Sequence, residues 1–193
     1  AVDLSSLYVD ITKDRMYCDA PDSPRRRATQ AAMHEIFSSL TRLLAPILAF
    51  TAEEAWGYFQ PGTSVHTQLF PAKRSSDAAA LTEGDRLLQL RALVSQALEK
   101  ARAEKTISNN LEATVTLQLA DAAELESLRP RLPELEEFLI LSELRLKPGE
   151  TDTATLTKTN AAKCERCWRH RESVGGDTAH PTLCDRCAAA ISR

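Results

Sequence analysis

The sequence predicts a mainly α-helical chain with a small α+β unit and a C-terminal four-cysteine zinc finger. Three observations favour this organisation. Apolar residues recur at helical spacing through the first third of the chain, a later segment alternates between apolar and polar residues, and two C-x-x-C pairs follow it. We therefore expect a helical domain over residues 1–80, an α+β domain over 81–159 and a zinc-binding module over 160–193.

Residues 1–80 are predicted to be helical because their apolar residues follow the helical period. The run Asp22-Ser23-Pro24 offers an N-cap followed by proline at the first helical position. The helix that starts there is expected to end or kink near Pro46. The capping box Thr51-Ala-Glu-Glu54 predicts the start of a second helix. Residues 65–80 show no sustained period and are expected to be an irregular connection.

Residues 81–159 are predicted to combine helices with three strands. Helical spacing resumes at Thr82, and residues 112–119 alternate strictly between apolar and polar side chains, which is typical of a half-buried strand. Asp121 can cap a helical stretch that extends to about Leu141. The other two strands are marked by Leu144 with Leu146 and by Ala154 with Leu156.

The two C-x-x-C pairs predict a zinc site in the last segment. Four thiolates complete the tetrahedral shell of Zn2+ and leave no position for water or substrate, so we expect one structural zinc ion. His170 and His180 lie between the pairs and could compete as ligands, and the cysteines could instead form two disulfides or be four unrelated thiols. The predicted ligands are Cys164, Cys167, Cys184 and Cys187.

The composition narrows the possible functions. The formal net charge is −3, so any nucleic-acid contact must come from local basic patches, of which Arg25-Arg26-Arg27 is the densest. With only six glycines, the chain has no glycine-rich phosphate loop. The apolar run from Leu43 to Phe50 is too short to cross a bilayer, and the start of the chain does not resemble a signal peptide. We therefore expect a cytoplasmic protein without membrane contact.

Four segments resemble the C-terminal part of bacterial isoleucyl-tRNA synthetase, a class I aminoacyl-tRNA synthetase, and the resemblance runs almost end to end. The first two look like the helical anticodon-binding domain shared by the isoleucine, valine, leucine and methionine enzymes, and the last narrows the resemblance to the isoleucine enzyme. At residues 108–110 the chain departs from the glycine and serine that relatives more often show. The segments are Lys13-Asp-Arg-Met-Tyr-Cys18, Leu43-Leu-Ala-Pro-Ile-Leu-Ala-Phe-Thr-Ala-Glu-Glu-Ala-Trp56, Asn110-Leu-Glu-Ala113 and Cys164-Glu-Arg-Cys-Trp168.

The resemblance implies a monomeric parent enzyme that forms isoleucyl-adenylate from isoleucine and ATP and then esterifies tRNA. The family's ATP-site signatures, His-x-Gly-His and Lys-Met-Ser-Lys-Ser, do not occur in this chain. We therefore expect the chain to recognise the anticodon stem-loop of isoleucine tRNA without catalysing a reaction. ATP and isoleucine would be bound only by the missing catalytic domain.

Several aromatic and basic residues are candidates for the RNA contact, because RNA bases stack on aromatic and guanidinium planes while cations hold phosphates. Trp168 follows a predicted zinc ligand, so its ring could stack on an anticodon-loop base, or it could instead cover the small core of the module. Arg166 could reach the same loop or pair with an acidic neighbour. The tRNA-binding candidates are Arg166, Trp168, Arg25, Arg26, Arg27, Lys13, Arg15, Arg42, Arg102 and Lys105.

Two different functions are compatible with the zinc finger alone. A DNA glycosylase of the formamidopyrimidine type has a zinc finger with similar cysteine spacing, but it predicts a Pro-Glu start and β-sandwich strands, whereas this chain starts Ala-Val-Asp and is predicted helical. A zinc-stapled protein-interaction module is the second such function. Binding of tRNA that weakens as salt rises would distinguish a nucleic-acid role from a protein-interaction role.

Overall fold

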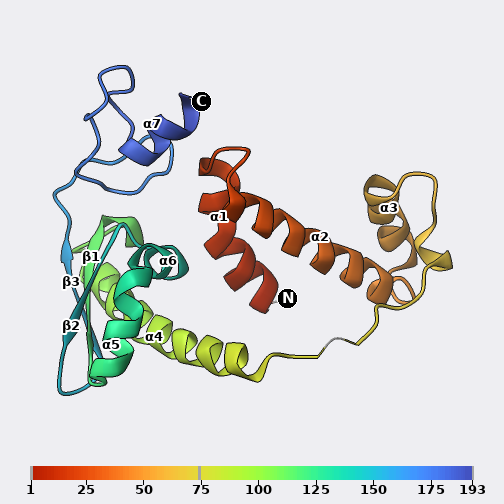
Figure 1. Ribbon diagram of the computed structural model, residues 1–193, viewed down its shortest axis with the longest axis horizontal. Coiled ribbons are helices and arrows are strands. Elements are labelled where there is room, and N and C mark those ends of the chain that lie inside the picture. Colours follow the sequence, from red (N-terminus) through yellow and green to blue (C-terminus); the bar gives the residue numbers. More distant parts are fainter. Residues whose placement is uncertain (1, 74, 193) are drawn as a thin grey trace. The chain divides into compact units, whose positions relative to one another are not determined.

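The computed structural model describes residues 2–73 and 75–192 and divides into two compact units (Figure 1). One unit combines Ala1–Ala20 with Ala78–Arg193, and the other is Pro21–Asp77. This division differs from the expected boundary after residue 80, because the first helix groups with the C-terminal segments. Among the described residues, no helix combines the length and the apolar character needed to span a bilayer.

The unit Pro21–Asp77 is built on two helices, α2 (Pro24–Leu44) and α3 (Ala49–Phe59). Helix α2 begins as predicted, since the Ser23 hydroxyl accepts a hydrogen bond from the Arg26 amide, and it ends shortly before Pro46. A short 3-10 turn, Val65–Thr67, follows α3 within the expected irregular connection.

The predicted capping box of α3 is wrong. The helix already begins at Ala49, and its N-cap residue Leu48 supplies no side-chain hydrogen bond. Within this helix, Glu53 accepts hydrogen bonds of 2.9 Å from the Ser64 hydroxyl and of 2.9 Å from the Val65 amide. The carboxylate therefore ties α3 to the 3-10 turn, and Trp56 and Val65 are buried together behind this contact.

The larger unit contains a three-stranded sheet in the order β2-β1-β3, with β1 parallel to β2 and antiparallel to β3. All three expected strands are present, and Asp121 caps α5 as predicted, accepting from the amides of Ala123 and Glu124. The elements of this sheet and its helices are α4 (Ala78–Ala103), β1 (Ala113–Leu119), α5 (Ala122–Leu128), α6 (Leu132–Phe138), β2 (Glu143–Pro148) and β3 (Thr153–Lys158).

The helices α4 and α5 cover one face of this sheet (Figure 1). Alternation along β1 directs Val115, Leu117 and Leu119 into the core, where they pack with apolar residues of α4 such as Leu90 and Val94. Because the strand pattern and the helical face meet in one cluster, the sequence periodicity is sufficient to explain this core.

Helix α1 (Val9–Cys18) continues from a π-helical segment, Val2–Tyr8, and contacts α6. The contact includes an ion pair in which Arg15 Nε lies 2.6 Å from Glu137 Oε1, a carboxylate that is almost completely buried. A last short helix, α7 (Asp185–Ile191), belongs to the cysteine-rich segment. The larger unit therefore brings the first helix and the C-terminal segment onto the same scaffold.

Replacing Leu117 with alanine should destabilise the larger unit by roughly 2–5 kcal/mol, because it leaves a cavity in the buried cluster. Urea unfolding followed by circular dichroism measures this loss. Leu88→Ala is the matched control, since Leu88 lies on α4 with 42% of its surface exposed. Equal destabilisation by the two variants would contradict the assignment of Leu117 to the core.

Candidate metal centre and nucleic-acid interface

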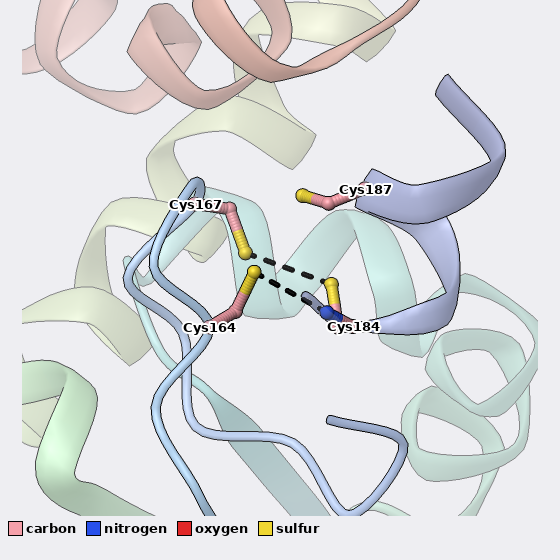
Figure 2. Close-up of side chains that lie close together, drawn as sticks. All are labelled: Cys164, Cys167, Cys184 and Cys187. Atoms are coloured by element: carbon pink, nitrogen blue, oxygen red, sulfur yellow. Dashed lines mark hydrogen bonds between the residues drawn. The ribbon is translucent and has the colours of Figure 1, made fainter. Parts of the chain in front are cut away.

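The four predicted zinc ligands converge in the structure. Their sulfur atoms all lie within 4.8 Å of one another, and Figure 2 shows the side chains of Cys164, Cys167, Cys184 and Cys187 pointing toward one another. The Sγ atoms of Cys167 and Cys184 are 3.8 Å apart. A tetrahedral zinc ion with Zn–S bonds of about 2.3 Å places its sulfurs about 3.8 Å apart, so the cluster matches the geometry of one ion.

Backbone hydrogen bonds shape the turn around the first C-x-x-C pair. The Trp168 amide donates to the Cys164 carbonyl over 2.9 Å, and the Cys164 amide donates to the Arg169 carbonyl over 2.9 Å. The second pair is placed by α7, which begins directly after Cys184 and carries Cys187. The Cys184 amide points to the Cys164 sulfur at 3.3 Å, so each loop helps to orient the other.

The chemistry of this donor set fits a divalent cation. The hydrogen bond with Cys187 and burial raise the pKa of the Cys167 thiol to about 12. A Zn2+ ion at the centre supplies the positive charge that lets such crowded thiols ionise. The two histidines that could have competed as ligands do not join the cluster within the described residues, and His170 Nδ1 instead lies 2.8 Å from the Ala161 carbonyl oxygen.

Arginines from both cysteine loops attach the metal centre to helix α1. Arg166 donates to the carbonyls of Tyr17, over 3.2 Å, and Cys18, which are orphan acceptors at the C-terminal end of the helix. Arg186 binds both carboxylate oxygens of Asp14 at 2.5 and 2.7 Å. This hydrogen-bonded pair raises the pKa of Arg186. The first helix of the chain is therefore the platform on which the zinc module rests.

A second set of ion pairs joins the module to α6. Arg171 Nη2 lies 2.6 Å from Glu136 Oε2, and the buried Arg169 lies 3.9 Å from the same oxygen. Arg169 also approaches Asp14 at 3.6 Å, so it connects the α1 platform with α6. The Glu136 carboxylate further accepts from the Leu144 amide at the start of β2. No role for Asp14 or Arg169 was predicted from the sequence, because their partners lie far away along the chain.

Trp168 is exposed at the surface of the first cysteine loop. The residue is 61% accessible, and its φ of 64° places it in the left-handed region that the loop's hydrogen bonds enforce. Lys163 Nζ lies 5.4 Å from the centre of the indole ring. This exposure argues against the interpretation in which Trp168 covers the core of the module.

The remaining tRNA-binding candidates occupy different environments. Arg15 and Arg166 make the intramolecular contacts described above, Lys13 is exposed and pairs with Asp10 at 2.9 Å, and Arg42 donates to the Leu69 carbonyl. Arg102, in the last turn of α4, and Lys105, in the turn that follows the helix, are exposed and have no ion pair among the described residues. Arg25, Arg26 and Arg27 form the first turn of α2 in the smaller unit.

The fold and the site together define a helical and α+β protein with a C-terminal zinc finger. Residues 162–190 match the zinc finger found in FPG and IleRS, which together with the four converging sulfurs supports one structural zinc. Residues 1–117 match the anticodon-binding domain of tRNA ligase. The chain belongs to this family of anticodon-binding domains.

Curated relatives agree with this assignment. The chain is similar to the isoleucine–tRNA ligases of Syntrophotalea carbinolica, with 41% identity, Brachyspira hyodysenteriae, with 40%, and Xanthomonas axonopodis pv. citri, with 42%. The alignments cover 100%, 98% and 99% of this chain but only 22%, 22% and 21% of the respective relatives. The chain therefore spans about a fifth of the length of these proteins, and the resemblance found in its motifs is confirmed.

Elemental analysis of the purified protein should find one zinc per chain, because the four sulfurs form a single closed site. Cys184→Ser should remove most of the bound zinc, while Cys18→Ser, a change at a buried cysteine outside the group of four, should retain it. Full zinc content in Cys184→Ser, or none in wild-type protein prepared without chelator, would contradict the assignment.

The pair of Asp14 with Arg186 should couple α1 to the zinc module by roughly 0.5–3 kcal/mol, the range for residues in direct contact. A double-mutant cycle of Asp14→Asn and Arg186→Gln, read by urea unfolding, measures the coupling. Asp10→Asn is the control on the same helix, because Asp10 forms an ion pair with Lys13, which is largely exposed. Additive effects of the Asp14 and Arg186 variants would show that the pair does not hold the module.

Proposed function

We propose that this chain is the tRNA-binding part of an isoleucine–tRNA ligase and that it recognises the anticodon stem-loop of isoleucine tRNA. The observation that carries the proposal is the match of residues 1–117 to an anticodon-binding domain. The named relatives support isoleucine as the amino acid in this proposal, since all three are isoleucine–tRNA ligases. ATP and isoleucine are bound by other parts of such an enzyme, which acts as a monomer in the cytoplasm.

In this proposal, each of the three segments of the chain has a different role. The helical residues 1–80 bind the stem-loop, residues 81–159 form the scaffold, and residues 160–193 present Trp168 on a zinc-stapled loop. A closed shell of four cysteines leaves the metal without a position for substrate, so its part is structural. The aminoacylation chemistry belongs to a catalytic domain elsewhere in the enzyme.

The basic candidates supply phosphate contacts in this proposal. Arg102 and Lys105 are exposed and without an ion pair in the described part of the chain, so a phosphate can bind them without breaking an internal contact. Arg15 and Arg166 are already engaged inside the larger unit, which favours a supporting role for both. The RNA contact therefore depends more on Trp168 and the exposed lysines and arginines than on these two.

The glycosylase function is not favoured. The matched zinc finger is found both in the formamidopyrimidine-type glycosylase (FPG) and in the isoleucine enzyme (IleRS), so it does not separate these two classes. The anticodon-binding match, in contrast, covers the helical first part of the chain. A protein-interaction role for the zinc module is the second candidate function. It predicts binding that does not follow the salt dependence of phosphate contacts.

Trp168→Ala should weaken binding of an isoleucine tRNA transcript by about 1–3 kcal/mol, the usual contribution of one base–aromatic stack, while leaving zinc in place. Titrations at two salt concentrations measure the affinity, which must fall as salt rises. Ile191→Ala is the matched control, because Ile191 is an exposed apolar residue of the same module. Equal affinities of Trp168→Ala and wild-type protein would remove Trp168 from the interface.

A further inference from the structure

A cavity of about 410 Å3 lies between helix α1, the segment that follows α6 and the first cysteine loop. Its apolar wall includes Ile11 from α1, Leu111 and Ile140 from the α+β scaffold, and Cys167 beside the metal centre. Tyr17 and Trp168 also line it. All of these residues belong to the larger unit, so the cavity is a feature of one compact body.

The charged groups around this cavity are engaged with one another. Asp10 pairs with Lys13 at 2.9 Å, Asp14 binds Arg186 at 2.5 Å, and Glu137 binds Arg15 at 2.6 Å. A carboxylate that is already neutralised does not repel an approaching polyanion as a lone one does. The cavity therefore offers mainly apolar contact surface to a ligand.

Two aromatic residues that line the cavity are accessible to a ligand. Tyr17 is 76% exposed and Trp168 is 61% exposed. Arg166 fixes the backbones that carry them, because it lies in the same cysteine loop as Trp168 and donates to the Tyr17 carbonyl over 3.2 Å. The relative position of the two aromatic residues is thus set by the docking of the zinc module on α1.

We propose that this cavity binds one unpaired nucleobase of the RNA and that Tyr17 is a base-contacting residue together with Trp168. This inference rests on the proposed tRNA-binding function and adds a site and a residue to it. A base is a flat ring with apolar faces, which suits an apolar wall bordered by two aromatic side chains. Lys163 beside the indole supplies positive charge for the sugar-phosphate chain of that nucleotide.

The test uses the full chain and a short stem-loop RNA carrying the isoleucine anticodon. Tyr17→Ala should weaken binding roughly 5- to 150-fold, as expected for loss of one base–aromatic stack, whereas Tyr17→Phe should keep nearly full affinity. Tyr58→Ala is the matched control, since Tyr58 is an exposed tyrosine on α3 with 85% accessibility. Zinc content and helical circular dichroism show that each variant is folded.

The same RNA stem without unpaired nucleotides probes the requirement for a free base. It should bind wild-type protein more weakly than the stem-loop and should show no difference between wild-type protein and Tyr17→Ala. The double variant Tyr17→Ala with Trp168→Ala should lose less affinity than the product of the two single losses, because both residues contact one base.

The outcomes separate this inference from the function on which it rests. If Trp168→Ala weakens binding and Tyr17→Ala does not, the cavity is not a base site and the tRNA-binding role stands. If wild-type protein binds neither the stem-loop nor a full isoleucine tRNA transcript at low salt, the proposed function fails as well. A Tyr17→Phe variant as weak as Tyr17→Ala would overturn the stacking role of Tyr17, because only the hydroxyl group is lost in that variant.

Discussion

The convergence of four cysteine sulfurs within 4.8 Å is the constraint on which the rest of the functional region depends. The C-terminal segment has few apolar residues of its own, and its buried cluster consists mainly of cysteines, including Cys18 from helix α1. Such a segment cannot bury enough apolar surface to fold by itself, so a metal ion must stabilise it. The metal also fixes the loops that carry Arg166 and Arg186, which are the groups that reach α1.

This arrangement links a structural metal to the surface that we propose for RNA recognition. The loop around Cys164 and Cys167 forces Trp168 outward, while its neighbour Arg169 points into the ion-pair network. Helix α1 contributes Tyr17 to the same side of the unit through the Arg166 contact. The ion-pair network is thus largely covered, and the residues that we propose to contact RNA are aromatic and exposed.

The sequence predicted those features that depend on local patterns. The spacing of the cysteines, the strict alternation along β1 and the cap at Asp121 each involve residues close together in the chain, and the structure agrees with them. The capping box at Thr51 was wrong because the helix begins at Ala49, so Thr51 and Glu54 both lie inside it. Local pattern alone could not show that the helix starts before its expected polar cap.

The docking of the zinc module could not be predicted, because its contacts join distant parts of the sequence. Asp14 and Arg186 are 172 residues apart, and Arg15 and Glu137 are 122 residues apart. A count of basic residues could not tell which arginines were already paired, so Arg15 and Arg166 were grouped with exposed candidates. A reversible zinc-removal experiment tests the central claim most directly: tRNA affinity and amide-exchange protection of α1 should both fall when zinc is chelated and both recover when it is restored. Unchanged affinity and protection in zinc-free protein would contradict it.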